Sequence, residues 1–192
     1  MNLFERIVRR LKFERWRNFR PAMYQVKYNP ADGVRLKNTR MSNTVFLTHE
    51  QGIQLGDNVY IGHYGILDGS NGITIEEGCQ LAAWNGIFSH SSHISVRLYG
   101  KEYGGGDMEG YIRGPVHIGK YTFVGSHALI MPGTKIGKGS IVAAYSLVKG
   151  EFPDFSIIAG NPAKVIGSTK TLDEPFLKAN PQLQKLYNEW AK

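Results

Sequence analysis

Two histidines lie three residues apart in the segment GIFSHSSHIS, where His90 and His93 stand among the serines Ser89, Ser91 and Ser92. An imidazole titrates near neutral pH, so histidine is the side chain best suited to take a proton from a hydroxyl group. An isolated histidine at a turn would most simply be a structural residue bonded to backbone. Two histidines surrounded by hydroxyl groups instead indicate a candidate site for proton transfer.

The remaining histidines and the single cysteine offer less chemistry. His49, His63, His117 and His127 fall at predicted turns or repeat boundaries, and we expect them to be structural or solvent-facing. Cys79 has no partner for an internal disulfide, which fits a reducing compartment such as the cytoplasm.

The charge of the chain is concentrated near its N-terminus. The 192 residues carry a net charge of +7. Residues 1–20 hold six Arg and one Lys against two Glu, a net charge of +5 that leaves +2 for the rest. A basic end rather than a basic body argues against nucleic-acid binding across the molecule. We find neither a signal peptide nor an apolar run of about 18 residues, so we expect no membrane span.

A six-residue repeat organises residues 116–150. The aliphatic positions of this repeat are Ile118, Val124, Ile130, Ile136, Val142 and Val148. Small residues follow the first five of them at the fourth position, namely Thr122, Ala128, Thr134, Ser140 and Ser146. Upstream, the same spacing joins Leu55, Ile61, Leu67 and Ile73, then slips by two residues and continues through Ile75, Leu81 and Ile87.

This period predicts an all-β fold, a parallel β-helix of triangular coils. Each face of a coil takes one hexapeptide, with the aliphatic residue pointing inward and the small residue at the tight corner. Each coil buries its core only against its neighbours, so the domain is a solenoid. A long α-helix is excluded because a period of six would spiral the apolar residues around its axis.

Three segments follow from this repeat. We assign residues 43–160 to the β-helix, residues 1–42 to a basic helix with an irregular lead-in, and residues 161–192 to a C-terminal loop and short helix. Residues 97–115 are rich in Gly and Tyr and lack the repeat, so we expect an inserted, folded flap.

The N-terminal segment predicts an amphipathic helix over residues 2–19. Phe4, Ile7, Val8 and Leu11 share one face and basic residues surround it. One interpretation is a helix packed on the domain or on a neighbouring subunit. The other is an interfacial helix that touches anionic lipid or a lipid-linked glycan at the inner face of a membrane.

Taken together, the hexapeptides, the loop after FSHSSH and the closing AGNPAKVIG resemble the left-handed β-helix acyltransferases. The resemblance covers residues 43–167 and is strongest to the sugar and polysaccharide O-acetyltransferases of the maltose/galactoside and xenobiotic acetyltransferase group. It implies a left-handed coil, a homotrimer, acetyl-CoA in a groove between neighbouring coils and a histidine as general base. By this resemblance His90 is the first candidate for the base, and His93 is the second or orients His90 or the acceptor.

The resemblance also implies a cofactor groove and an acceptor site. Carried over by motif, the groove residues are Ser126, Ala143, Ala144, Gly160, Asn161, Pro162, Ala163 and Lys164, with Lys164 as phosphate partner. The acceptor candidates are Asp68, Asn71, Trp84 and Asn85. Tyr145 departs from the Gly that the family commonly has, and Gly167 stands where a basic residue often follows, with Lys170 as its substitute.

Together with the two histidines, the resemblance implies an acetyl-CoA-dependent O-acetyltransferase that acts on a small-molecule or lipid-linked sugar hydroxyl, without a metal. Direct transfer gives Cys79 a packing role only. Three alternatives stay open: N-acetylation of an amino sugar, a zinc carbonic anhydrase on the same coil, and a non-catalytic solenoid that binds a glycan or partner. The zinc enzyme needs three histidines across an interface, and His90, His117 and His127 do not show that family's pattern.

Overall fold

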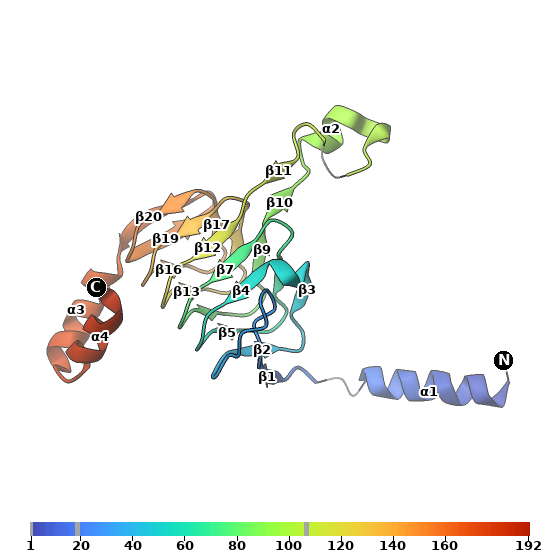
Figure 1. The fold of residues 1–192 in the computed structure, drawn as a ribbon, viewed down its shortest axis with the longest axis horizontal. Coiled ribbons are helices and arrows are strands. Elements are labelled where there is room, and N and C mark those ends of the chain that lie inside the picture. Colours follow the sequence, from blue (N-terminus) through green and yellow to red (C-terminus); the bar gives the residue numbers. More distant parts are fainter. Residues whose placement is uncertain (1, 18–19, 106–107) are drawn as a thin grey trace.

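The structure, a computed structural model, describes residues 2–17, 20–105 and 108–192. Its body is a parallel β-solenoid of stacked triangular coils (Figure 1), as the six-residue repeat predicts. We name its three sheets face 1, face 2 and face 3 in the order in which the chain meets them. The corners are named by the faces that they join.

Each face is a ladder of short strands. Face 1 contains β1 (Met23–Gln25), β2 (Arg40–Ser42), β5 (Tyr60–Ile61), β8 (Gln80–Leu81), β13 (Phe123–Val124), β16 (Ile141–Val142), β19 (Ser156–Gly160) and β20 (Ala163–Ser168). Face 2 contains β3 (Phe46–Thr48), β6 (Ile66–Asp68), β9 (Gly86–Phe88), β14 (Leu129–Ile130) and β17 (Leu147–Val148). Face 3 contains β4 (Ile53–Leu55), β7 (Ile73–Ile75), β12 (Val116–Ile118), β15 (Lys135–Ile136) and β18 (Glu151–Phe152).

The predicted aliphatic residues form the core. On face 2, for example, Leu67 lies in register with Ile87, and Ile87 with Ile130, and all three are fully buried. Burying one such side chain contributes about 1.5–3 kcal/mol, so the stack of coils is held mainly by this column of contacts.

The slip of two residues has a structural cause. Both Ile73 and Ile75 of β7 are buried, because face 3 of the early coils carries two inward residues in each strand. Leu55 of one coil is in register with Ile75 of the next, so these coils take twenty residues rather than eighteen. Later coils are shorter, as the pairing of Val124 with Val142 shows.

The corners need small residues for steric and for polar reasons. The hydroxyl groups of Thr134 and Ser140 each donate to the carbonyl oxygen three residues earlier, at 2.7 Å, while both residues are buried. A Cβ atom on Gly125 would lie 2.6 Å from the backbone nitrogen of Ala144 in the next coil. This contact requires glycine, since nothing in the backbone there can give way cheaply.

Aromatic rings line corner 1/2. Tyr64, Trp84, His127 and Tyr145 occupy equivalent left-handed turn positions with φ between 59° and 65°. Their neighbouring ring centroids lie 4.3, 5.9 and 4.8 Å apart. Stacking of the rings offsets part of the strain of the left-handed backbone.

The insertion is a folded flap, but it starts earlier than predicted. The chain leaves the coil after β9, and β10 (His90–Ser91) pairs antiparallel with β11 (Ile112–Arg113). Between them lie α2 (Ser95–Tyr99) and the 3-10 turn η2 (Gly100–Glu102); residues 106–107 lie outside the described part. The predicted bounds, 97–115, missed the first seven residues because His93 lies six residues after Ile87 and so continues the spacing of the repeat.

The ends of the chain are helical. The segment α1 (Leu3–Arg17) begins with a reciprocal cap, in which Asn2 Oδ1 accepts from the Glu5 backbone nitrogen and Glu5 Oε2 accepts from the Asn2 nitrogen. Residues 18 and 19 of the predicted helix lie outside the described residues. Another 3-10 turn, η1 (Glu50–Gly52), precedes β4. At the C-terminus there are two helices, α3 (Thr169–Ala179) and α4 (Leu183–Ala191), rather than the single one expected, because Pro175 inside α3 obscured its pattern.

Candidate active site

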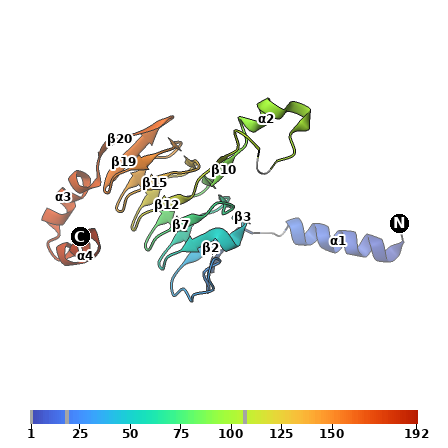
Figure 2. The same cartoon turned by 45° about the horizontal axis from the view of Figure 1, so that its top comes forward.

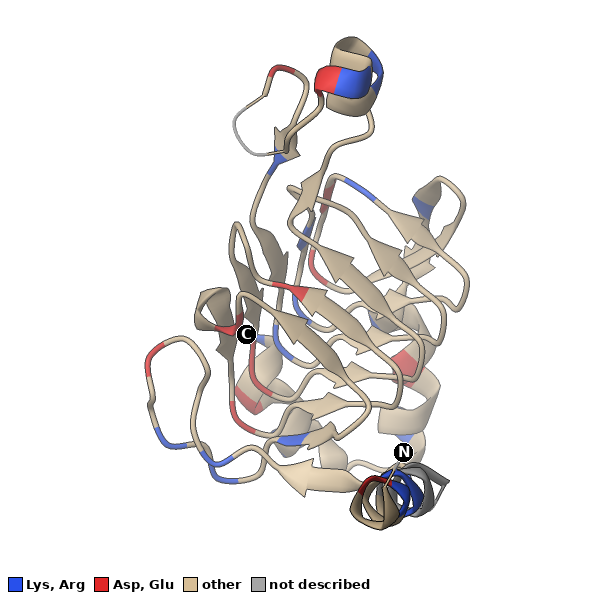
Figure 3. Ribbon diagram, turned by 90° about the vertical axis from the view of Figure 1, so that its right-hand side faces the viewer, with Lys and Arg blue, Asp and Glu red and all other residues tan. Residues whose placement is uncertain are grey.

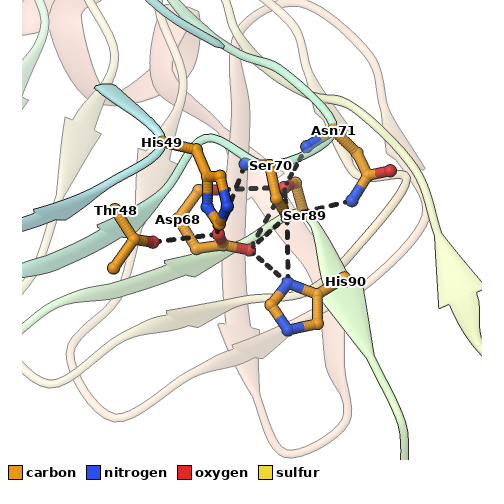
Figure 4. A network of polar contacts seen from close by, with 7 residues as sticks. All are labelled: Thr48, His49, Asp68, Ser70, Asn71, Ser89 and His90. Carbon is orange, nitrogen blue, oxygen red and sulfur yellow. Dashed lines mark hydrogen bonds and ion pairs between the residues drawn. The ribbon is translucent and has the colours of Figure 1, made fainter. Parts of the chain in front are cut away.

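A buried carboxylate holds His90 at corner 2/3. Asp68 ends β6 and is 4% exposed, whereas the His90 side chain starts the flap and is 35% exposed. The Nδ1 atom of His90 lies 2.5 Å from Asp68 Oδ2 (Figure 4). The coil and the flap therefore each supply one member of the pair.

The pairing fixes which imidazole nitrogen carries the proton. An ionised carboxylate can only accept hydrogen bonds, so Nδ1 of His90 must donate to Asp68. In the neutral ring this leaves the lone pair on Nε2, which can take up a proton. Asp68 also stabilises the imidazolium that such a step creates. The arrangement is that of a general base with an orienting carboxylate.

Hydroxyl groups keep Asp68 ionised. Burial alone would raise the pKa of Asp68, but hydrogen bonds from Ser70, Thr48 and His90 outweigh it and lower the pKa from 3.8 to about 2. The Thr48 and Ser70 hydroxyl groups each donate to the carboxylate at 3.0 Å. The Ser89 hydroxyl donates to the Asp68 backbone oxygen at 2.7 Å. Asp68 is thus charged at any pH at which the protein would work.

The flap covers one face of the His90 ring. Tyr111, next to β11, stacks on His90 with a centroid distance of 5.5 Å and an interplanar angle of 4°. The guanidinium of Arg113 lies 4.5 Å from the Tyr111 ring centroid. Pairing of His90 with Arg113 across the flap strands sets this geometry. Tyr111 therefore restricts tilting of the His90 ring by stacking on its face, and Asp68 fixes the ring edge that carries Nδ1.

Two other histidines, His49 and His93, differ in their relation to the site. His49 Nδ1 lies 3.5 Å from Asp68 Oδ1, so it joins the candidate site, although its sequence position suggested a structural residue. His93 is exposed, and its Nδ1 contacts the Ser91 hydroxyl at 2.8 Å. Asp68 orients His90, and among the described residues His93 makes no hydrogen bond or ring contact with His90. A role for His93 toward the acceptor stays a prediction.

Of the acceptor candidates, Asp68 and Asn71 belong to this network. Asn71 donates from its backbone nitrogen to Ser89 Oγ at 2.9 Å and from Nδ2 to Ser70 Oγ at 3.0 Å. Asp68 is too buried to be a simple acceptor ligand, and its contacts assign it the orientation of His90 instead. A role for Asn71 toward the acceptor stays a prediction.

Trp84 and Asn85 lie at corner 1/2, away from His90. Asn85 is buried and bonds the Ala82 carbonyl and the Ala128 nitrogen, at 2.8 and 3.0 Å, so its prediction as a sugar ligand is corrected to a corner residue. Trp84 is half-exposed, but Tyr64 and His127 stack against its ring. Packing in the corner, rather than stacking on a sugar, is the role that these contacts favour for Trp84.

The predicted groove residues gather along corner 1/2. The backbone carbonyl oxygen of Ser126 accepts from the Tyr145 nitrogen at 3.0 Å, and Ala144 is exposed. Gly160, Asn161, Pro162 and Ala163 form the turn between β19 and β20, which ends the solenoid. The Gly160 nitrogen donates to Ser146 Oγ at 3.2 Å and so ties this turn to the corner.

An exposed cation stands beside that turn. Lys164 follows it on β20 and is exposed to solvent. Exposed backbone beside a lysine suits a ligand with a long amide-bearing arm and phosphates, as coenzyme A has. The groove set therefore fits the predicted cofactor, at the opposite edge of face 2 from His90.

Several site residues escaped the sequence analysis: Thr48, His49, Ser70 and Tyr111. For the residues of the coils, the available signal was the twenty-residue coil. It places Thr48 of β3 in register with Asp68 of β6, and Asp68 with Phe88 of β9, directly before Ser89. Counting coils of eighteen hid this column.

Comparisons with known proteins point to the same group. Residues 111–150 match the family described as bacterial transferase hexapeptide (six repeats). A probable acetyltransferase of Mycobacterium tuberculosis is 32% identical over 119 residues, covering 62% of this chain and 38% of that protein. A putative acetyltransferase of Saccharomyces cerevisiae is 38% identical over 117 residues, covering 59% and 55%. The chain thus spans about half or less of the length of these relatives.

Solved structures agree on the fold. A galactoside acetyltransferase in complex with coenzyme A is 26% identical, with a TM-score of 0.58 over 68% of this chain and 62% of that chain. A hexapeptide-repeat acetyltransferase of Vibrio cholerae has a TM-score of 0.60 at 24% identity over 69% and 71%, which speaks for the fold alone. The chain therefore carries bacterial transferase hexapeptide repeats and is similar in sequence and fold to the hexapeptide-repeat acetyltransferases, the group that its motifs resemble.

Proposed function

We propose that the protein is an acetyl-CoA-dependent O-acetyltransferase with His90 as general base. The observation that carries this proposal is the short contact between His90 Nδ1 and the buried, ionised Asp68. It leaves Nε2 of a partly exposed imidazole available to a substrate hydroxyl group. A purely structural histidine would have no need of a buried carboxylate held by two hydroxyl groups and a second histidine.

The reaction then runs by direct transfer. Nε2 of His90 removes the proton of the acceptor hydroxyl as its oxygen attacks the thioester carbonyl. The resulting tetrahedral oxyanion collapses, the carbon–sulfur bond breaks and the coenzyme A thiolate leaves. The imidazolium of His90, stabilised by Asp68, returns its proton to that thiolate. No covalent enzyme intermediate forms, and the buried Cys79 takes no part.

We propose further that the active unit is a homotrimer. The outer side of face 2 exposes Phe46, Ile66 and Leu129, which are 63%, 41% and 42% exposed in the single chain. Such an apolar strip on a sheet favours a protein–protein contact. Face 2 also separates corner 1/2, with the groove residues, from corner 2/3, with His90.

A cyclic trimer would reunite the two halves of the site. Cyclic trimers use heterologous contacts, so corner 1/2 of one subunit can lie beside corner 2/3 of the next. Acetyl-CoA bound along the first corner would then present its thioester to His90 of the neighbour. The separation of both residue sets within one chain supports this arrangement.

For the acceptor we propose a sugar hydroxyl, on a small molecule or a lipid-linked precursor. The surroundings of His90 are polar, with Ser70, Asn71 and His49 within the same network. Such groups suit recognition of a neutral polyol. N-acetylation of an amino sugar uses the same base and is distinguished by its product.

The test is a screen of sugar acceptors with acetyl-CoA, read by thiol release and by the mass of the product. An ester, which hydroxylamine cleaves, is expected; an amide would replace O-acetylation with N-acetylation. His90→Ala should bind acetyl-CoA as the wild type does and retain only a small residual rate of transfer. Full transfer by this variant would refute the assignment of the base.

A further inference from the structure

The N-terminal helix exposes an apolar face. Leu3, Phe4 and Leu11 are 74%, 73% and 60% exposed, and Ile7 on the same side is about half-exposed. Both ribbon views draw α1 standing apart from the coils (Figures 1 and 2). The sequence left open that this face packs on its own domain, on a neighbouring subunit or on anionic lipid. The exposure of these side chains excludes packing on the solenoid of the same chain.

The rest of the helix surface is basic. Arg6, Arg9 and Arg10 are exposed and lie outside the apolar face, and the ribbon in Figure 3 colours basic positions of α1 blue. Seven cations against two acidic residues give residues 1–20 their net charge of +5. A binding partner that matches this helix must offer an apolar region for the apolar face and negative charges beside it for the arginines.

We propose that α1 lies in the interface of an anionic lipid bilayer and holds the enzyme at the membrane surface. The apolar face enters the boundary between headgroups and acyl chains, and the arginines meet lipid phosphates. An apolar protein groove alone would explain the leucines but not the excess of arginine. In the part of the chain that the structure describes, we find no helix with the length and apolar character of a membrane span.

This attachment is independent of acetyl transfer. It concerns a segment that shares no residue with the candidate site, so either proposal can fail without the other. If both hold, the acetylated hydroxyl belongs to a substrate presented at the membrane.

The experiment is co-sedimentation of the full-length protein with vesicles. Binding is expected to vesicles of phosphatidylcholine with phosphatidylglycerol and to be much weaker to phosphatidylcholine alone. The triple variant Arg6→Glu, Arg9→Glu and Arg10→Glu should bind the anionic vesicles at least about 100-fold more weakly, since each basic residue contributes roughly fivefold. Raising the salt from about 0.1 to 1 M should also weaken wild-type binding.

Matched variants separate specific from general effects. Lys101→Glu, Lys149→Glu and Lys185→Glu change the net charge equally at exposed positions outside α1 and should leave vesicle binding within about twofold of the wild type. Ile7→Asp with Leu11→Asp should abolish binding, whereas Ile7→Leu with Leu11→Ile should preserve it. Unchanged acetyl-CoA titration and unchanged thermal unfolding of each variant show that the coils are intact.

Two outcomes would overturn the proposal. The first is equal vesicle binding by the triple arginine variant of α1 and by the triple lysine variant outside it. This result would show that the arginines of α1 contribute no more to lipid binding than other basic residues do. Absence of vesicle binding, with a lower molecular mass of the Ile7 and Leu11 variant in light scattering, would show that the apolar face contacts a second copy of the chain instead.

Discussion

Replacing Asp68 with asparagine tests how the buried carboxylate prepares His90 for proton transfer. The change keeps the size of the side chain but removes the charge that faces His90 Nδ1 at 2.5 Å. A hydrogen bond to a charged group contributes about 1.5–3 kcal/mol. The imidazolium forms only as the proton moves, so this energy is lost mainly from the transition state. We expect kcat to fall about 10- to 150-fold at saturating substrates, with little change in the affinity for acetyl-CoA.

The assay is thiol release with a confirmed acceptor, and the control is Glu76→Gln. Glu76 lies 3.5 Å from His117 on face 3, so this variant removes a second carboxylate–histidine pair outside the site. It should leave kcat within about twofold of the wild type, because the pair is partly exposed and lies outside the site. Because Asp68 acts through His90, Asp68→Asn should add no further loss to His90→Ala. A kcat of Asp68→Asn equal to that of the wild type, or additive losses in the double variant, would refute this reasoning.

Three further predictions concern the flap, acid stability and the thiol. Tyr111→Ala should lower kcat about 2- to 10-fold, because it removes a ring stack worth about 0.5–1.5 kcal/mol. Tyr111→Phe keeps the ring and should retain the rate. Equal rates for both variants would contradict the role of the stack. The pKa of Asp68 is about 2 in the folded state and 3.8 ordinarily. Ionisation of Asp68 therefore adds about 2 kcal/mol to the free energy of unfolding above pH ~4, and this contribution is lost as the pH falls through about 2. Denaturant unfolding across this range should show that loss in the wild type and not in Asp68→Asn. Burial raises the pKa of Cys79 to about 12, so a thiol reagent should label it only on unfolding, and Cys79→Ala should keep its transfer activity; rapid labelling of the folded protein would contradict its packing role.

The solenoid could be predicted because its repeat is local. Each inward aliphatic residue and each small corner residue recurs along the chain itself, so Ile118 or Ser140 can be recognised without knowing the contacts. The turn formed by Gly160 and Pro162 was likewise visible as a short motif. Coil length was harder, because the second inward residue of β7 changes the count only on face 3.

The candidate site was only partly predictable because it joins distant coils. His90 drew attention by residue type, but its partner Asp68 lies 22 positions earlier and meets it only through the stacking of β6 on β9. Tyr111 reaches His90 through the antiparallel pairing of the flap, which no local pattern announces. Asn85 was assigned to the acceptor by resemblance, whereas its burial and its bonds to Ala82 and Ala128 appear only in three dimensions.

The most direct test of the central claim is a calorimetric titration of acetyl-CoA into the purified protein. The account predicts saturable binding with about one equivalent per chain, since each trimer boundary would hold one cofactor. Absence of heat and of binding at millimolar acetyl-CoA would contradict the acetyltransferase assignment and leave a solenoid that binds a glycan or a protein partner.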